Sequence, residues 1–559
     1  MTNDGDAAVA VVTRDDAVPA ASTTGGRPAP RLADRWAFVA FVAIAVVSVP
    51  LLLRLGEDRW FQYDEWDFLA SRDAGSLHDL FEPHGPHWST LPILVFRAEW
   101  YLFGLHSYWT YQLVCVLSHL TVVVLVRTVM RRAGVRPWTA TAAALPLMFF
   151  GAGEENIAYA FQINFNAALA FGLVHLLLAD HDGPVDQRDW LALLAGFAGL
   201  LSSGIAVTMV VIVGLAVLLR RGWRVAVLHT ASLGAAYLVW YAVIGQRGYE
   251  SQNASDPIEA LAFARTTIAA GFGGLAQVPG LGWALGLLVV GGLFLAWHHQ
   301  PWSQARKVAA APAALAGGAF VFVLITSFGR VGFAPGIERS TRYVYVVGTL
   351  LLPAVAVAAD AVMRRWRAAV PVLVVALAAS LVGNVQDFSN ERPYSGEFLA
   401  GYRNLLLTMP RTSFADQVPR GVRPERGLAP YVSLGWLLDG VESGRIPPPG
   451  DMAPGQRATA EIRLALQEHP DHRPVDCETV AGPVDTTLNR GSSIRTRRGD
   501  QLWAGYTDSA GADGFVLFRA NVPVVAYAGP LEVRVSSTPD GSVELCDRDG
   551  GPVTVRSGP

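Results

Sequence analysis

The chain has 559 residues, of which 52% are hydrophobic and only 16% are charged, whereas soluble domains carry about 25% charged residues. Polar sequence lies before residue 35 and after residue 384, and long apolar runs lie between them, which is typical of a membrane protein. The net charge of −3 provides no overall basic field, so the composition argues against a nucleic-acid partner.

The apolar runs predict the spans. Residues 1–34 are expected to be a disordered N-terminus, and the run at 36–55, with no cleavage site after it, indicates a signal anchor. Because a spanning helix needs about 20 apolar residues, we expect about eleven spans. The short one at 190–203 is either tilted or broken from its successor at 202–204. The predicted spans are 36–55, 108–128, 138–153, 163–179, 190–203, 205–220, 225–244, 281–297, 308–328, 343–362 and 367–383.

Five groups of basic residues set the expected orientation. With the predicted spans, all five fall on one side of the membrane, which the positive-inside rule makes cytoplasmic. The N-terminus is then cytoplasmic, and the loop 57–107, the turn 151–162 and the soluble part 384–559 are extracytoplasmic, as in a multi-pass cell-membrane protein. The groups are Arg27, Arg31 and Arg35; Arg127, Arg131, Arg132 and Arg136; Arg220, Arg221 and Arg224; Arg306 and Lys307; and Arg364, Arg365 and Arg367.

The first outer loop, 57–107, contains the acidic stretch Asp64, Glu65, Trp66 and Asp67. If this stretch is helical, Asp64 and Asp67 share a face and Glu65 is turned away. Three crowded carboxylates repel one another, which raises the pKa of at least one unless a cation lies among them, and such tuning suits a general base. The alternative is a solvated acidic turn.

An acidic pair in the first outer loop, followed by amphipathic loop helices, about eleven spans and an outer C-terminal domain, resembles the GT-C superfamily of membrane glycosyltransferases, including the actinobacterial cell-envelope type. The resemblance covers 36–383 and implies transfer of a sugar from a polyprenyl-phosphate donor to a glycan, glycolipid or glycoprotein acceptor. Asp64 matches the first acidic position and is the expected catalytic base, and Glu65 matches the second. Asp67 has no firm counterpart, and we assign it with Trp66 to sugar binding.

The second outer turn carries two adjacent carboxylates, Glu154 and Glu155, which are costly at a membrane surface unless they are used or exposed. Glu154 with Glu65 is the predicted pair of ligands for Mg²⁺ or Mn²⁺. Glu155, Gln162 and Asn164 are predicted to bind sugar hydroxyls. A solvated helix cap and polar contacts between helices are the alternatives.

Arg330, Arg339 and Arg342 lie in another outer turn, 329–342, which we call the third outer turn. A guanidinium there can bind the donor phosphate bidentately. We rank Arg342 first; anchoring to lipid headgroups is the alternative. His84 and His87 are further candidates for the donor phosphate or a metal, although no third ligand supports zinc and ordinary interfacial histidines remain the alternative.

The soluble part 384–559 predicts helices at 397–409 and 459–469 and short alternating strands between 502 and 546. An extracytoplasmic position permits a disulfide between Cys477 and Cys546. The predicted fold is therefore an α-helical polytopic membrane domain at 35–383, GT-C-like, with a C-terminal α+β or β-rich domain.

Two other functions compete with a hexosyl- or pentosyltransferase. A transporter or flippase of lipid-linked sugars would place polar residues at mid-membrane and show internal repeats, whereas the polar residues here lie at outer helix ends. A non-catalytic cell-envelope assembly protein is the other alternative.

Overall fold

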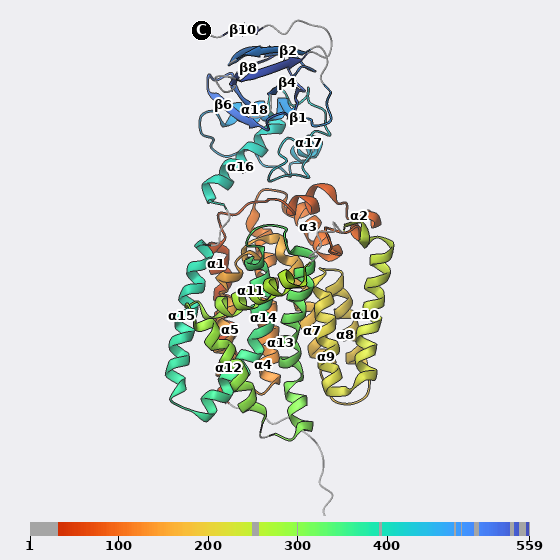
Figure 1. Cartoon of the computed structure of the whole chain (residues 1–559), viewed down its shortest axis with the longest axis vertical. Helices are drawn as coiled ribbons and strands as arrows, with labels where there is room; N and C mark the ends of the chain where they lie inside the picture. Colours follow the sequence, from red (N-terminus) through yellow and green to blue (C-terminus); the bar gives the residue numbers. More distant parts are fainter. Residues whose placement is uncertain are drawn as a thin grey trace, which may run out of the picture.

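The computed structural model describes residues 32–248, 256–298, 300–390, 394–473, 477–481, 483–496, 502–536, 541–546 and 555–557. A bundle of helices forms one part of the chain, and a mixed part with all the described strands stands on one end of it (Figure 1). Residues 1–31 of the predicted N-terminus lie outside the described residues.

Each of the predicted spans coincides with a helix. The helix α5 ends at Met148, before the predicted end at 153, and α8 and α9 are separated at 201–204. The helices are α1 (Leu32–Leu55), α4 (Tyr108–Arg132), α5 (Pro137–Met148), α7 (Ile163–Ala179), α8 (Gln187–Leu200), α9 (Ile205–Arg221), α10 (Trp223–Val243), α12 (Leu281–Trp297), α13 (Trp302–Arg330), α14 (Thr341–Arg365) and α15 (Ala369–Asn390).

Seven helices in the described part of the chain are long and apolar enough to cross a membrane: α1, α4, α7 with the preceding turn, α10, α13, α14 and α15. Helix α11 (Pro257–Ala276) and α12 form an eighth candidate, bent by 97° at their junction. The helices α5, α8 and α9 have 12, 14 and 17 residues, so length alone supports fewer spans than the eleven predicted. The chain is a polytopic α-helical membrane protein.

Small residues let the bundle pack closely around α14, most of which is buried. A Cβ on Gly318 of α13 would lie 2.1 Å from Ile212 of α9, and one on Gly292 of α12 would lie 2.5 Å from Ala358 of α14. In lipid, where helices gain little from hydrophobic burial against each other, such close backbone approach is a main source of stability.

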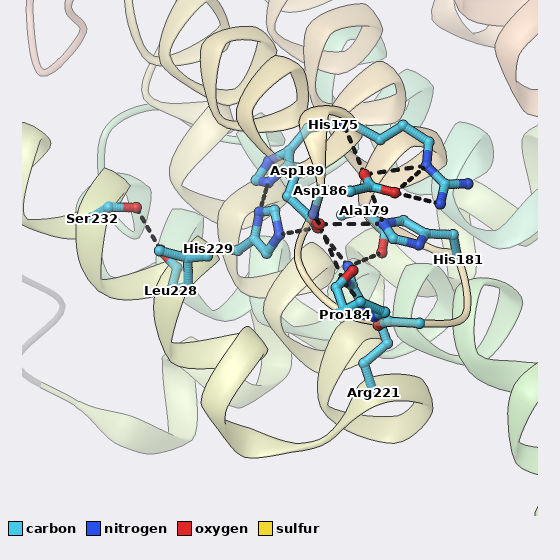
Figure 2. A network of polar contacts seen from close by, with 12 residues as sticks. His175, Ala179, His181, Pro184, Asp186, Asp189, Arg221, Leu228, His229 and Ser232 are labelled. Carbon is cyan, nitrogen blue, oxygen red and sulfur yellow. Dashed lines mark hydrogen bonds and ion pairs between the residues drawn. The ribbon is translucent and has the colours of Figure 1, made fainter.

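A buried polar network joins α7 to α10 at the ends of these helices remote from the first outer loop (Figure 2). The carboxylate of Asp189 is fully buried and accepts hydrogen bonds from Arg221 Nη2 at 3.1 Å and from the backbone N–H of Asp186 at 2.8 Å. His229 Nε2 lies 3.1 Å from the same carboxylate, and His229 Nδ1 lies 3.0 Å from Nε2 of His175. Since its charges are paired internally, we interpret this network as structural.

The first outer loop folds into three short helices: the π-helix η1 (Asp67–Ser71), α2 (Leu77–Phe81) and α3 (Thr90–Phe103). Ser76 caps α2 by accepting a hydrogen bond from the N–H of Asp79 at 3.2 Å. The second outer turn forms η2 (Gly151–Gly153), α6 (Glu155–Ala158) and η3 (Ala160–Gln162). Helix α11 contacts the third outer turn, η5 (Ile337–Arg339), where Thr267 Oγ1 donates to Glu338 O at 2.8 Å.

The C-terminal part begins with α16 (Gly396–Thr408), α17 (Leu434–Glu442) and α18 (Gln456–Ala465). Two five-stranded sheets follow, with strand orders β1-β7-β4-β9-β2 and β10-β3-β8-β5-β6, and every pairing is antiparallel. This agrees with the predicted β-rich domain. The strands are β1 (Leu466–Glu468), β2 (Cys477–Ala481), β3 (Val484–Leu488), β4 (Ser493–Thr496), β5 (Leu502–Thr507), β6 (Asp513–Phe518), β7 (Val524–Ala526), β8 (Leu531–Ser536), β9 (Ser542–Cys546) and β10 (Val555–Ser557).

The predicted disulfide is present between Cys477 of β2 and Cys546 of β9, which face each other in the paired strands. The cysteine at 115 is buried in α4. The bridge links the two paired strands at one end of their ladder and closes a segment with a sequence separation of 69 residues.

The C-terminal part is docked on the first outer loop through one aromatic core. Trp100 stacks on Trp436 of α17 with ring centroids 4.6 Å apart, and Trp60 lies edge-on to Tyr402 of α16 at 5.4 Å. Trp66 is fully buried in the same core, 6.0 Å from Trp436. Its indole cannot stack on a sugar from this position, so the sugar-binding role predicted for Trp66 is replaced by a packing role.

Candidate active site

The acidic stretch forms a tight turn at the outer end of the bundle. Tyr63 adopts a left-handed conformation, with φ of 47°, and its N–H donates to Leu428 O in the C-terminal part at 2.7 Å. The Asp64 side chain is 41% exposed, whereas Glu65 and Asp67 are buried. The turn therefore presents a single carboxylate outward.

Asp64 and Asp67 lie on the same side of the turn, as the helical spacing predicts, and His84 lies between them. His84 Nδ1 is 2.7 Å from Asp67 Oδ2, and His84 Nε2 is 3.4 Å from Asp64 Oδ1. Arg72 binds Asp67 with two nitrogens, Nε at 3.1 Å and Nη2 at 3.0 Å. Asp67 is thus an internal anchor, and its buried position does not fit the sugar contact predicted for it.

Sequence reasoning missed Arg72. Residues five apart do not meet on an α-helix, because a turn takes 3.6 residues. The π-helical turn η1 between them brings Asp67 and Arg72 together. Only recognition of that unusual turn would have revealed the pair.

The ionisable side chains of Asp64, Asp67 and His84 shift one another's pKa values. Burial raises the pKa of Asp64, but the hydrogen bond and charge of His84, aided by the Arg342 charge, outweigh it and lower the pKa below its ordinary value. The same balance, with Arg72, lowers the pKa of Asp67. Burial opposes charge on His84, yet its two carboxylate partners raise its pKa to about 9. At neutral pH the exposed Asp64 carboxylate is ionised.

Glu65 points away from this group into the protein. Its carboxylate accepts hydrogen bonds from the N–H of Gln62 at 2.9 Å and from the Tyr108 hydroxyl at 2.9 Å. Burial raises its pKa to about 8 in spite of these contacts and the Arg59 charge. A fully buried side chain cannot touch a substrate, so Glu65 supports the turn from behind rather than acting as a second catalytic carboxylate.

Glu154 is buried as well, in an ion pair with the buried Arg59. The Arg59 guanidinium therefore takes the position beside Glu154 and Glu65 that the sequence assigned to Mg²⁺ or Mn²⁺. Within the described ranges, the side chains close enough to hold an ion form two other groups, His78 with Asp79 and Glu82, and His181 with Asp186 and Asp189. The predicted pair of metal ligands does not fit a cation.

Glu155 faces the other way and joins the third outer turn to the site. Its carboxylate accepts hydrogen bonds from Gln162 Nε2 at 3.0 Å and Thr341 Oγ1 at 3.1 Å, and Arg342 Nε lies 3.5 Å away. The Arg342 side chain is one-third exposed and is held at the start of α14 by Ser340 Oγ at 3.2 Å. Glu155 and Gln162 thus position Arg342, whose charge acts on Asp64.

The remaining predicted residues are more dispersed. His87 is half-buried and neutral, and its Nδ1 accepts a hydrogen bond from the N–H of Gly204 at 3.2 Å. Its pKa is lowered to about 3 by burial first, and then by charges that include Arg330 and Arg342. A neutral ring whose Nδ1 is engaged by a backbone N–H does not suit the predicted phosphate contact.

Arg330 stacks its guanidinium on Phe333 at 5.0 Å, and Arg339 is exposed on η5. Asn164 is buried, and its Oδ1 finds no hydrogen-bond partner among the described residues. Of the three arginines predicted for the donor phosphate, Arg342 is the one that the structure couples to Asp64.

The chain matches no known protein-family model and no curated protein. It is similar to the solved structure of apo ArnT from Cupriavidus metallidurans, with a TM-score of 0.44 and 15% identity over 81% of this chain and 94% of that chain. ArnT from Cupriavidus metallidurans bound to undecaprenyl phosphate matches with a TM-score of 0.41 and 16% identity, over 74% of this chain and 90% of that chain. Both TM-scores lie below 0.5 and both identities lie below 25%, so this likeness does not assign a function.

Proposed function

We propose that the protein is a membrane glycosyltransferase that moves a sugar from a polyprenyl-phosphate donor to an acceptor on the extracytoplasmic face. The observation that carries this proposal is the pairing, at one end of the bundle, of an ionised and partly exposed carboxylate, Asp64, with a partly exposed guanidinium, Arg342, whose charge acts on it. A base and a phosphate-binding cation are the two groups that such a transfer needs.

In the proposed reaction, the Asp64 carboxylate removes the proton from an acceptor hydroxyl. The resulting oxygen attacks the anomeric carbon of the donor, a new glycosidic bond forms, and the bond between that carbon and the phosphate oxygen breaks. Polyprenyl phosphate leaves with the electron pair. Arg342, held by Glu155, binds the phosphate oxygens and stabilises the charge that develops on them.

The orientation of the protein is part of the proposal. The basic groups that end α4, α9 and α14 lie at the ends of these helices remote from Asp64. By the positive-inside rule, we propose that this end is cytoplasmic, with the N-terminus inside and the C-terminal domain outside the cell. A lipid-linked sugar with its phosphate at the outer membrane surface would meet Arg342 at headgroup level.

The proposed reaction has no step through a metal ion, because Arg59 neutralises Glu154 and faces Glu65. Transfer should persist in the presence of a chelator. Loss of transfer on chelation, restored by Mg²⁺ or Mn²⁺, would give the predicted metal a role on other ligands.

The test is an assay with the full-length protein in liposomes. A panel of radiolabelled polyprenyl-phosphate hexoses and pentoses, offered with glycan, glycolipid and peptide fractions of a cell envelope, should release polyprenyl phosphate while label appears on one acceptor. The panel would also decide whether the acceptor is of the actinobacterial cell-envelope type. Movement of the donor between leaflets without release would identify a flippase, and neither event would favour an assembly protein.

A further inference from the structure

His84 is held in one orientation by its surroundings. Its backbone forms a short antiparallel bridge with His87, through N–H to O contacts of 2.9 and 3.0 Å, across a turn that Gly85 closes with φ of +52°. The ring packs near Phe68 and Phe161, with centroids 5.3 and 5.2 Å away. Its side chain is only 12% exposed. These contacts favour one orientation of the ring.

Both ring nitrogens of His84 face carboxylates. Nδ1 lies 2.7 Å from Asp67 and Nε2 lies 3.4 Å from Asp64. A carboxylate accepts and does not donate, so both nitrogens must carry hydrogen to satisfy both contacts, and the ring is an imidazolium. Neither nitrogen has a lone pair to offer a metal, and Nε2 already faces Asp64, so the metal and phosphate roles predicted for His84 do not fit.

The far side of Asp67 is fixed by Arg72, which also donates to the backbone oxygen of Pro83 at 3.0 Å, next to His84 in the chain. The row Arg72, Asp67, His84 and Asp64 therefore alternates in charge from a buried end to an exposed end. Two cations and two carboxylates alternate in this row, and Arg72 also pairs with Glu82, whose carboxylate lies 3.3 Å from Nη1. Only Asp64, at the exposed end, is accessible to a substrate.

We propose that His84 is a positioning residue that fixes the orientation of the Asp64 carboxylate and holds it ionised for proton removal, with Asp67 and Arg72 as its anchor. This inference rests on the proposed function, because it assigns to His84 a role in the step that Asp64 performs. His84 acts on the substrate only through Asp64.

This role determines the pH dependence of transfer. The charged groups around His84 are Asp64, Asp67 and Arg72 from its own loop, with the neutral His87 next to it and Arg342 reaching in from α14. The Asp64 charge also acts on the phenol of Tyr159, and the charges of Asp64 and Asp67 act on that of Tyr431. Since the pKa of His84 is about 9, transfer should fall as the pH rises through about 9 and the imidazolium loses its charge.

The test compares His84→Gln with His78→Gln, a matched change on an exposed ring of the same loop. We expect His84→Gln to lower kcat by about 10- to 100-fold, as large a loss as when the partner that orients a metal ligand is removed. KM for the donor should change little. The alkaline limb near pH 9 should disappear, and the acid limb should move to higher pH, because Asp64 is then easier to protonate. His78→Gln should behave as wild type.

A second variant keeps the test decisive if His84→Gln does not fold. Asp67→Asn retains the ring but weakens its anchor, so the alkaline limb should shift below pH 9. If Asp64→Asn abolishes transfer while both His84→Gln and Asp67→Asn keep the wild-type kcat and pH profile, the positioning role is refuted and the proposed function stands. If Asp64→Asn itself transfers sugar at the wild-type rate, the assigned base fails.

Discussion

Glu154 and Glu155 are neighbours in the chain, yet their carboxylates serve opposite sides of the outer turn. Glu154 points inward to the buried Arg59, and Glu155 points outward to Arg342 and Thr341. Glu154 stabilises the buried side of the site through Arg59, and Glu155 positions Arg342. The two should therefore differ sharply when each is neutralised.

Glu154→Gln should lower the stability of the fold more than it lowers the rate of sugar transfer. Removing one partner of a buried ion pair leaves a charge without compensation, and because Glu65 still faces Arg59 we expect the low end of the usual range, about 3 kcal/mol. Thermal unfolding in detergent would measure it. Glu155→Gln should leave the melting temperature nearly unchanged but raise the KM for the donor. The opposite pattern would contradict the division of roles.

Arg342→Gln should lower kcat by about 100-fold, the usual effect of removing one electrostatic stabiliser of a transition state. Arg342→Lys should recover only part of this loss, because an ammonium cannot bind a phosphate bidentately. Steady-state kinetics on the donor would measure both, with Arg265→Gln on the exposed side of α11 as the control. Equal losses for the control and Arg342→Gln would point to a general surface-charge effect.

Glu65 should make stability depend on pH. Its pKa is raised by burial to about 8 in the folded protein, so the folded state binds a proton more tightly than the unfolded state does. That contribution is fully present below the ordinary pKa of about 4.3 and is lost as the pH rises through about 8. Between pH 5 and 8.5, the melting temperature of wild type should fall relative to that of Glu65→Gln, which has no titrating group at this position. A difference that stays constant would refute the raised pKa.

The disulfide should stabilise the C-terminal domain. The bond closes a segment with a separation of 69 residues, and removing such a bond costs about 2–4 kcal/mol. The paired change Cys477→Ser with Cys546→Ser should make 477–546 more sensitive to limited proteolysis while the helical bundle remains resistant. Equal resistance in both proteins would show that the bond contributes little.

The sequence predicts most of the membrane part because apolar length is a local signal. The structure has a helix at every span that the sequence predicts. It also has the Cys477–Cys546 disulfide that the predicted topology permits. The helical spacing also brings Asp64 and Asp67 to one side correctly. Local patterns therefore suffice for the elements and for the shared side of Asp64 and Asp67.

The sequence predictions fail where contacts between residues far apart in the chain determine the position of a side chain. Trp66 is buried by Trp436, some 370 positions away, which no local pattern reveals. The sequence could not separate Glu154 from Glu155, since adjacent residues differ only in the direction that the turn gives them. It assigned a metal where Arg59 supplies the charge, because a buried arginine and a bound ion satisfy the same carboxylates.

The central claim is that Asp64 is the base for sugar transfer. Single-turnover transfer from the matching polyprenyl-phosphate sugar, measured for wild type, Asp64→Asn and the exposed-loop control Asp73→Asn, tests it most directly. We predict that Asp73→Asn transfers at the wild-type rate and that Asp64→Asn is slower by about 10²–10⁴, the usual contribution of a general base, while both bind the donor. Wild-type transfer by Asp64→Asn would contradict the account.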